Sequence, residues 1–289
     1  MIKKRRAQLY AAIIGLIGFS SAVLASGGIL DPKGIVTFQE RQLMFDTVAL
    51  MLVVVLPVII MSFAFAYRYR RKKHIGQYRP DWSHNGLLEL FWWGIPTLII
   101  VVLGVILWHA THKLDPYRKL DVPGPTETIE VVALRWKWLF IYPNEHIATI
   151  NDLYLPVNKQ VQFLITADGP MSAFDIPQLI GQIYAMAGMR TRQHLYSSYE
   201  GVYDGLNTQL NGDGFSYMHF PVHVASQADF DGWVNNIQGK ANPLTLSKYS
   251  KLYEPDINAP AQYYSDVPQD LFNKIMMQYM MKDKWLHQW

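Results

Sequence analysis

Two long apolar segments constrain the architecture of this chain more than any other feature. Residues 44–67 read MFDTVALMLVVVLPVIIMSFAFAY, and residues 87–110 read LLELFWWGIPTLIIVVLGVILWHA. Each is close to the ~20 residues that an α-helix needs to cross the hydrocarbon layer of a membrane. Pro57 and Pro96 fall inside the segments, where neighbouring helices can satisfy the freed backbone carbonyls. We therefore predict two transmembrane helices in a lipid bilayer, each kinked at its proline.

The loop between the two segments, residues 68–86, is strongly basic. Its basic residues are Arg68, Arg70, Arg71, Lys72, Lys73 and Arg79. Short loops rich in lysine and arginine stay on the cytoplasmic side of a membrane. This loop is therefore predicted to be cytoplasmic, and the outer ends of both helices are predicted to face the opposite side.

The N-terminus has the layout of a secretory signal. A basic cluster at residues 3–6 precedes an apolar run over residues 11–25, which ends in small residues. This pattern predicts a signal peptide over residues 1–25, cleaved after Ala25. An uncleaved signal anchor is the alternative, since the apolar run is nearly long enough to span a membrane. Residues 26–43 would then form a periplasmic segment ahead of the first helix.

From about residue 123 the long apolar runs give way to short ones. TIEVVALRWKWLFIYP, ATINDLYLPVNKQVQFLITA and YMHFPVHVAS are rich in β-branched and aromatic residues and are separated by turn residues. Such runs predict the strands of an antiparallel sandwich or barrel over residues 123–240. A short helix is expected over residues 229–237. The tail, residues 241–289, mixes helical stretches with proline-containing turns.

The composition excludes several kinds of chemistry. The chain has 289 residues and no cysteine, so it has no disulfide, thiolate metal site or cysteine nucleophile. Its formal net charge is only +3, and without a basic stripe in the outer domain no nucleic-acid partner is expected. His219 and His223 could share one face of a strand, but structural histidines are commoner than metal ligands in such a pattern.

One loop of the predicted outer domain is spaced like a metal-binding loop. The stretch GLNTQLNGDGFSYM, residues 205–218, places Asn207 and Asn211 four residues apart, followed by Phe215 and Met218. Among these side chains, only the thioether of Met218 suits a soft metal ion. The loop therefore has the spacing of a metal site without its ligands.

Glu89 lies about one turn inside the second apolar segment, at its cytoplasmic end. A carboxylate this shallow can extend to the interface at little cost. Acidic residues within transmembrane helices also often belong to proton pathways. The sequence leaves both roles for Glu89 open.

Several motifs together resemble subunit II of the haem–copper respiratory oxidases over nearly the whole chain. ILDPKG follows the signal region, and WSHNGLLELFWWGIPTLII enters the second helix. The outer-domain motifs are RWKWLFIYP, FDIPQLIGQIYAMAGMRTR and GVYDGLNTQLNGDGFSYMHF. The motif sequences are most similar to those of the quinol-oxidising branch, the cytochrome bo-type ubiquinol oxidases. The resemblance implies a membrane α-helical hairpin, an all-β cupredoxin-like Greek-key barrel and a partly helical C-terminal extension.

In the cytochrome c oxidase branch of this family, the barrel holds two copper ions. The resemblance places one copper-binding histidine at Ser172 and the two cysteines at Asn207 and Asn211. The backbone carbonyl donor falls at Gln209 and the second histidine at Phe215, and only the methionine is retained, as Met218. Amides are poor substitutes for bridging thiolates, so no metal and no cofactor are expected in this chain. Trp136 and Trp138 match the aromatic strand that carries electrons in the copper-containing branch, and here they are expected to serve in packing.

The resemblance implies a non-redox subunit of a proton-pumping quinol oxidase in the bacterial inner membrane. Its partners would be oxidase subunits I, III and IV. Haems and copper would reside in subunit I, which would also take electrons from a membrane quinol, and cytochrome c would not be a partner. The glutamate at the position of Glu89 lies, in the family, at the mouth of a proton pathway. Many quinol-oxidase relatives carry a lipidated cysteine after the signal, which this chain lacks.

Two other functions compete with this one. A copper electron-transfer subunit would need the missing cysteines. A membrane-tethered periplasmic binding or sensor protein could reuse the same barrel, although a plain anchor has no need of a glutamate and a proline in its second helix.

Overall fold

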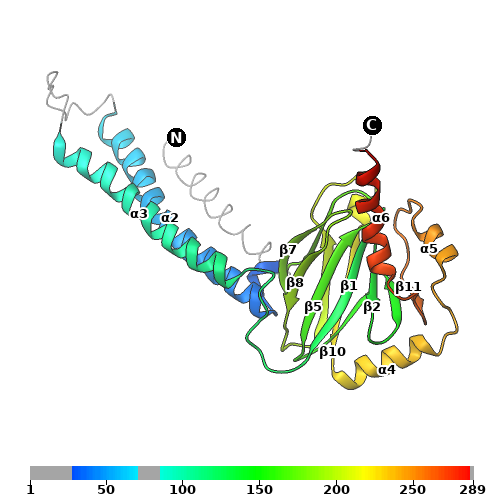
Figure 1. Ribbon diagram of the computed structural model, residues 1–289. Helices are drawn as coiled ribbons and strands as arrows, with labels where there is room; N and C mark the ends of the chain where they lie inside the picture. Colours follow the sequence, from blue (N-terminus) through cyan, green and yellow to red (C-terminus); the bar gives the residue numbers. More distant parts are fainter. Residues whose placement is uncertain (1–27, 71–84, 287–289) are drawn as a thin grey trace, which may run out of the picture. The chain divides into compact units, whose positions relative to one another are not determined.

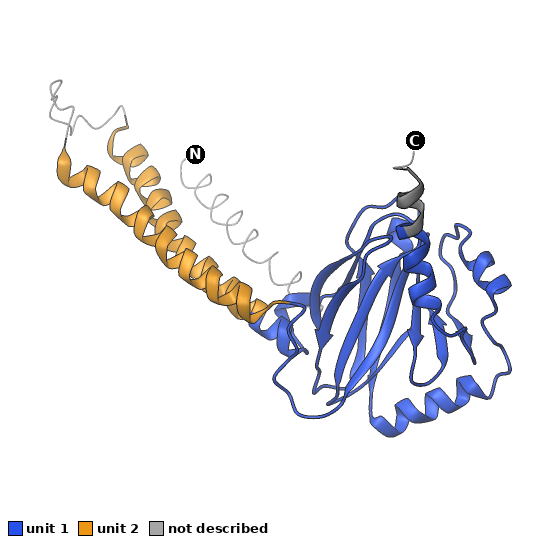
Figure 2. Ribbon diagram, viewed as in Figure 1, with its two compact units in different colours: residues 1–39, 116–289 blue, residues 40–115 orange. Residues whose placement is uncertain are grey.

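The computed structural model describes residues 28–70 and 85–286, in two compact units (Figures 1 and 2). One unit is Glu40–Asp115, and the other combines the segment before it with Pro116–Trp289. The proposed signal peptide and most of the basic loop, with Arg71, Lys72, Lys73 and Arg79, lie outside the described residues.

Two long helices account for most of the smaller unit, and the first turn of one of them belongs to the larger unit. Helix α2 spans Ile35–Arg68 and helix α3 spans Gly86–Lys113. Both are long and apolar enough to cross a membrane, and most of their apolar side chains are exposed. This is the composition of a helix whose surroundings are lipid rather than water. Helix α2 begins well before the predicted start at Met44, because no glycine or proline interrupts residues 35–43.

The larger unit contains two packed sheets. The strand order is β11-β3-β2-β1-β5-β8 in one sheet and β4-β10-β9-β6-β7 in the other. Their bounds are β1 Thr126–Leu134, β2 Lys137–Tyr142, β3 Ile147–Ile150, β4 Leu153–Pro156, β5 Gln160–Ala167, β6 Ser172–Ile176, β7 Ile180–Ala185, β8 Thr191–Leu195, β9 Gly201–Asn207, β10 His219–Ala225 and β11 Gln262–Tyr264.

The expectation of an antiparallel barrel needs correction for two of these pairings. Strand β1 pairs in parallel with β5, and β10 pairs in parallel with β4. The partners in each case come from distant parts of the chain, so no short hairpin forces them to run in opposite directions. The alternation of apolar and polar residues along one strand does not indicate whether that strand pairs in parallel or antiparallel.

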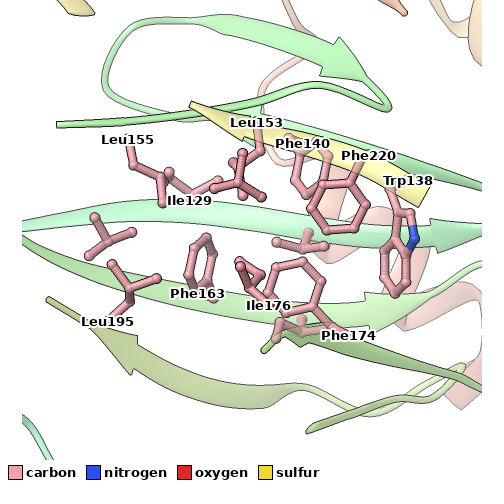
Figure 3. Packing of buried hydrophobic residues seen from close by; sticks show 14 of the residues in the cluster. Ile129, Trp138, Phe140, Leu153, Leu155, Phe163, Phe174, Ile176, Leu195 and Phe220 are labelled. Atoms are coloured by element: carbon pink, nitrogen blue, oxygen red, sulfur yellow. The ribbon is translucent and has the colours of Figure 1, made fainter. Parts of the chain in front are cut away.

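An aromatic core fills the space between the sheets (Figure 3). Trp138 and Phe140 on β2 face Phe174 on β6 and Phe220 on β10. The rings of Phe174 and Phe220 are stacked with centroids 5.7 Å apart, and Trp138 meets both edge-on. Edge-on and stacked contacts of this kind add to the stabilisation from burying the rings.

A second apolar cluster lies on the opposite face of the larger sheet. Val132, Leu134 and Leu139 alternate along β1 and β2 with residues of the inner core. Apolar residues of the C-terminal extension cover them, including Leu271, Phe272 and Ile275. Since these strands are buried on both faces, they read as continuous apolar runs.

The C-terminal extension packs on the barrel. Helix α4, Gln227–Gln238, precedes it; within the extension α5 spans Leu246–Leu252 and α6 spans Leu271–Leu286, while β11 adds a strand beside β3. Residues 241–280 form part of the barrel's own compact unit.

A buried carboxylate ties the extension to the barrel. Asp168, just after β5, is 1% exposed. It accepts hydrogen bonds from the hydroxyl of Tyr249, from the hydroxyl of Tyr279 at 2.7 Å and from the side-chain amide of Gln278 at 2.8 Å. Burial, together with the Asp168 carboxylate, raises the pKa of Tyr249 and of Tyr279, so both phenols stay protonated and donate. We call this cluster the Asp168 clasp.

The segment before α2 is also fixed to the barrel. The backbone N–H groups of Lys33 and Gly34 donate to the carbonyl of Gln178 at 2.7 and 3.1 Å, and Ile35 N–H donates to Tyr196 O at 3.2 Å. A Cβ at Gly34 would lie only 2.0 Å from the carbonyl oxygen of Leu179. Glycine is therefore required at this point of the ILDPKG motif.

Candidate functional site: a buried polar network around Met218

The loop that joins β9 to β10 brings most of the candidate metal-loop residues together. Asn207 is the last residue of β9, and Met218 directly precedes β10. The backbone N–H of Asn207 donates to Met218 O at 3.1 Å, which closes the loop at its base. Both side chains point into the barrel and are buried, with Met218 fully inaccessible.

The sulfur of Met218 is held by two amide groups. The side-chain nitrogen of Asn207 donates to Met218 Sδ at 3.3 Å, and that of Asn211 donates at 3.2 Å. A thioether sulfur is a weak acceptor, yet here it accepts two hydrogen bonds away from water.

The remaining polar atoms of the amides reach the backbone and one hydroxyl. The Oδ1 of Asn207 accepts from Ala173 N at 2.8 Å and from Gln209 N at 3.1 Å, and its Nδ2 also donates to Gln209 O at 2.9 Å. The Nδ2 of Asn211 donates to Ser172 Oγ at 2.9 Å. The Oδ1 of Asn211 is buried and has no partner among the described residues. We call Ser172, Asn207, Gln209, Asn211 and Met218 the Met218 network.

Phe215 stands at the edge of this network. It opens a short 3₁₀ turn, Phe215–Tyr217, with its N–H donating to Gly212 O at 3.1 Å and its carbonyl accepting from Met218 N at 3.2 Å. Its half-buried ring offers no polar atom. It therefore shapes the loop through its backbone.

Trp136 covers the loop from the tip of the β1–β2 hairpin. It has a left-handed backbone with φ of 64°, and its Nε1 donates to Asn211 O at a long 3.4 Å. A Cβ at Gly214 would lie 2.3 Å from Cγ of Trp136, so the loop needs a glycine beneath the indole. The expectation that Trp136 and Trp138 share a strand is wrong: Trp136 forms the turn and only Trp138 lies in β2. No Gly, Pro or Asn marks this turn in the sequence.

The donor set of the Met218 network does not fit a copper centre. Its side chains offer amides, one hydroxyl and one thioether, whereas a binuclear copper–thiolate centre needs bridging sulfur and imidazole ligands. Across the part of the chain that the structure describes, no group of three or more His, Cys, Asp or Glu side chains could hold a metal ion.

Glu89 belongs to the other compact unit. It lies in the first turn of α3, whose N-cap Asn85 accepts hydrogen bonds from Leu87 N at 3.1 Å and Leu88 N at 3.2 Å. The first turn of a helix carries a positive partial charge, which favours a carboxylate at this position. Glu89 is partly exposed.

The two histidines of β10 have separate surroundings. His219 is exposed, whereas Nε2 of His223 lies 3.2 Å from Oδ1 of Asp152, and its ring stacks on Tyr154. Asp152 also accepts a hydrogen bond from the hydroxyl of Tyr263 at 2.6 Å. Sequence reasoning missed Asp152 and Asp168 because both are single carboxylates whose partners are distant in the chain.

Comparison with known proteins gives two family matches. Residues 141–226 match the family described as cytochrome c oxidase subunit II, periplasmic domain, and residues 238–283 match the COX aromatic rich motif. The second match covers most of the C-terminal extension, including the tyrosines of the Asp168 clasp.

Two relatives align with nearly the whole chain. Cytochrome bo(3) ubiquinol oxidase subunit 2 of Pseudomonas putida is 44% identical over 282 residues, covering 96% of this chain and 88% of the relative. Ubiquinol oxidase subunit 2 of Acetobacter aceti is 41% identical over 285 residues, covering 96% and 92%. Among solved structures, the periplasmic domain of subunit II of cytochrome oxidase of Bradyrhizobium japonicum aligns at 22% identity and a TM-score of 0.39, covering 41% of this chain and 98% of that one.

Proposed function

The chain belongs to the subunit 2 family of the ubiquinol oxidases, and on that premise we propose that it is a subunit II without a redox centre of its own. In this role it braces subunit I on the periplasmic side, and it also assembles with subunits III and IV. The haems and copper of the complex reside in subunit I, which oxidises a membrane quinol and reduces oxygen to water.

The Met218 network is the observation that carries this proposal. Two asparagine amides and a serine hydroxyl occupy the positions that the resemblance assigns to cysteines and a histidine, and they hydrogen-bond to the methionine sulfur and to one another. These groups are poor copper ligands, so the barrel offers no relay for electrons from a soluble cytochrome. Electrons must then enter the complex elsewhere, which fits a membrane quinol at subunit I.

Oxygen uptake tests this proposal directly. The full chain, purified with its partners in mild detergent, should support oxygen uptake with a quinol and none with reduced cytochrome c. Haem should be present in the same preparation. Uptake driven by cytochrome c would contradict the proposal, and a preparation without haem or uptake would favour a tethered binding or sensor protein instead.

Glu89 is proposed to be a proton-pathway entrance. Its place in the first turn of α3, close to the predicted cytoplasmic interface, suits a carboxylate that takes up protons from water. Glu89→Ala should slow quinol oxidation severalfold while leaving the complex assembled, and Glu89→Asp should restore part of the rate. Unchanged turnover in an assembled Glu89→Ala complex would leave the carboxylate as an interfacial residue only.

The two helices and the match to a periplasmic domain fit an inner-membrane protein with a periplasmic domain. The finer topology that we propose has both helices spanning the membrane, the loop over residues 68–86 in the cytoplasm and the barrel outside. The chain has no cysteine, so a single introduced cysteine is a unique reporter. A cysteine at Gly76 should react only with membrane-permeant thiol reagents, and labelling by an impermeant reagent in intact cells would reverse the topology.

A further inference from the structure

Strand β8 carries two buried nitrogen atoms without partners on its outer face. Arg192 and His194 pair in register with Leu164 and Gln162 of β5, whereas Leu195 faces the inner core. The Nε of Arg192 and the Nε2 of His194 are both buried, and neither has a hydrogen-bond partner among the described residues. His194 is only 3% exposed. Unpaired buried polar atoms are rare in native proteins, so two of them at alternate positions of one strand need an explanation.

The linker that follows α3 covers these residues. The Nδ1 of His194 lies 3.1 Å from the carbonyl oxygen of Pro116, which fixes the imidazole with Nδ1 protonated and Nε2 directed elsewhere. Lys119, on the same linker, is exposed. We call Lys119, Arg192 and His194 the basic cluster.

The basic cluster has an excess of positive charge. No ion pair involves any of its three side chains within the described part of the chain. Burial lowers the pKa of His194, and the charges of Arg192 and Lys119 lower it further. Ordered water could satisfy the open hydrogen bonds, but it would not offset the charge of a partly buried guanidinium. A bound anion would satisfy the open hydrogen bonds and would also offset the charge of the guanidinium.

We propose that the basic cluster binds a phosphate group. A guanidinium presents paired N–H donors that match phosphate oxygens, and a lysine ammonium adds a mobile charge beside it. Because a bound anion offsets the charges of Arg192 and Lys119, it favours protonation of His194, whose Nε2–H then donates to the phosphate.

The place of the cluster in the chain favours a lipid headgroup over free phosphate as the source. Lys119 stands six positions after Lys113, the last residue of α3. Six residues of extended chain reach at most about 20 Å, so a short linker tethers Lys119 to the end of a proposed transmembrane helix. Basic side chains within about a Debye length of a bilayer surface attract the anionic lipid headgroups of that leaflet, whichever side of the membrane they face.

Binding to the full chain in a neutral detergent at pH 6 tests the proposal. Native mass spectrometry would compare phosphatidylglycerol with a diacylglycerol of the same acyl chains, which lacks the phosphate. Inorganic phosphate would be titrated separately and also added as a competitor. We expect selective retention of phosphatidylglycerol, which assigns the site to a lipid headgroup. Binding of inorganic phosphate alone would support the site but assign it to the free ion.

Variants locate the site. Arg192→Gln should weaken phosphate or lipid binding about tenfold or more, as expected for loss of a charge-assisted hydrogen bond. Lys119→Gln, at an exposed position, should weaken it about two- to fivefold. The matched control is Arg118→Gln, because Arg118 is an exposed arginine of the same linker that already pairs with Asp121 at 3.1 Å.

Two outcomes would overturn the proposal. One is that the unmodified chain retains neither phosphatidylglycerol nor inorganic phosphate above the diacylglycerol background. The other is that folded Arg192→Gln binds as well as the unmodified chain. If Arg192→Gln does not fold, Lys119→Gln decides, and an affinity equal to that of Arg118→Gln would contradict the site.

Discussion

The Met218 network and the Asp168 clasp both bury polar groups, yet they are built in opposite ways. The Met218 network is neutral, lies within one end of the barrel and uses a weak sulfur acceptor. The clasp centres on a carboxylate and joins segments up to 111 residues apart in the chain. Hydrogen bonds to a charged group are stronger than those to a neutral one. We therefore expect the barrel to lose more stability from a change in the clasp than from a change in the Met218 network.

The substitutions with the largest expected effect convert the Met218 network into a metal site. Ser172→His, Asn207→Cys, Asn211→Cys and Phe215→His together would supply two thiolates and two imidazoles around Met218, the soft donors that copper prefers. The full chain carrying these changes should bind copper and show intense visible absorption from thiolate–copper charge transfer. The control carries only the two histidine substitutions and should remain colourless. Absence of bound copper would contradict the assignment of these positions.

Substitution in the clasp should cause the largest loss of stability. Asp168→Asn keeps the shape of the side chain but removes its charge and replaces one acceptor oxygen by an NH₂ donor, which then faces either Tyr249 or the pair Gln278 and Tyr279. The expected cost is about 2–3 kcal/mol, since bonds to a charged group contribute about 1.5–3 kcal/mol. The melting temperature of the barrel, followed by circular dichroism of the full chain, should fall by roughly 5–10 °C.

Tyr249→Phe serves as a matched control for the clasp, because it removes one of the three donors and leaves the carboxylate paired. Its effect should be clearly smaller than that of Asp168→Asn. Equal melting temperatures for Asp168→Asn and the unmodified chain would remove the distinction between the two clusters.

Removal of the sulfur acceptor should cost much less. In Met218→Leu the volume is nearly kept, and each amide retains another acceptor, Gln209 O for Asn207 and Ser172 Oγ for Asn211. The expected loss is about 1 kcal/mol, measured by chemical unfolding of the same preparation. A loss as large as that of Asp168→Asn would show that the neutral network is equally important for stability.

Glu130 extends the comparison of the two clusters. It is another carboxyl group beside the C-terminal extension, but it does not belong to the Asp168 clasp. It lines a pocket of about 240 Å³ together with Asp270, at the start of α6. Burial, reinforced by the charge of Asp270 and opposed by Arg190, raises the pKa of Glu130 to about 7. A carboxyl with a raised folded-state pKa holds its proton more tightly when folded, so its contribution to stability is present at low pH and is lost as the pH rises through about 7.

Glu130→Gln should remove this dependence. The free energy of unfolding of Glu130→Gln minus that of the unmodified chain should increase between pH 5 and pH 8. This difference should be smallest at pH 5. Denaturant titrations at the two pH values measure it. A difference that does not change with pH would mean that Glu130 is not protonated in the folded chain near neutrality.

Local patterns in the sequence predicted a large part of the fold. The two apolar segments, the β-rich barrel and the helical pieces of the tail follow from apolar periods and turn residues. The parallel pairing of β1 with β5 did not follow, because register between distant strands leaves no local signature. The Arg135–Trp136 turn was missed because it places a tryptophan at positive φ, where the sequence shows no Gly or Asn to signal a turn.

Only those residues of the candidate site that the resemblance places in the metal-binding loop could be predicted from the sequence. Asn207, Asn211 and Met218 were identified by position, and the structure brings them together. The Asp168 clasp and the basic cluster depend on which residues the linker and the extension cover. That information lies in the three-dimensional packing and has no motif of its own.

Strand β11 has a consequence beyond holding the tail in place. Without it, β3 would present a row of unpaired backbone groups at the end of the larger sheet, a ready template for another chain. With it, the sheet ends in a strand of only three residues, Gln262–Tyr264, and the smaller sheet ends at β4 with four. Edges this short recruit other strands poorly. The extension therefore also shields one edge of the larger sheet from pairing with another chain.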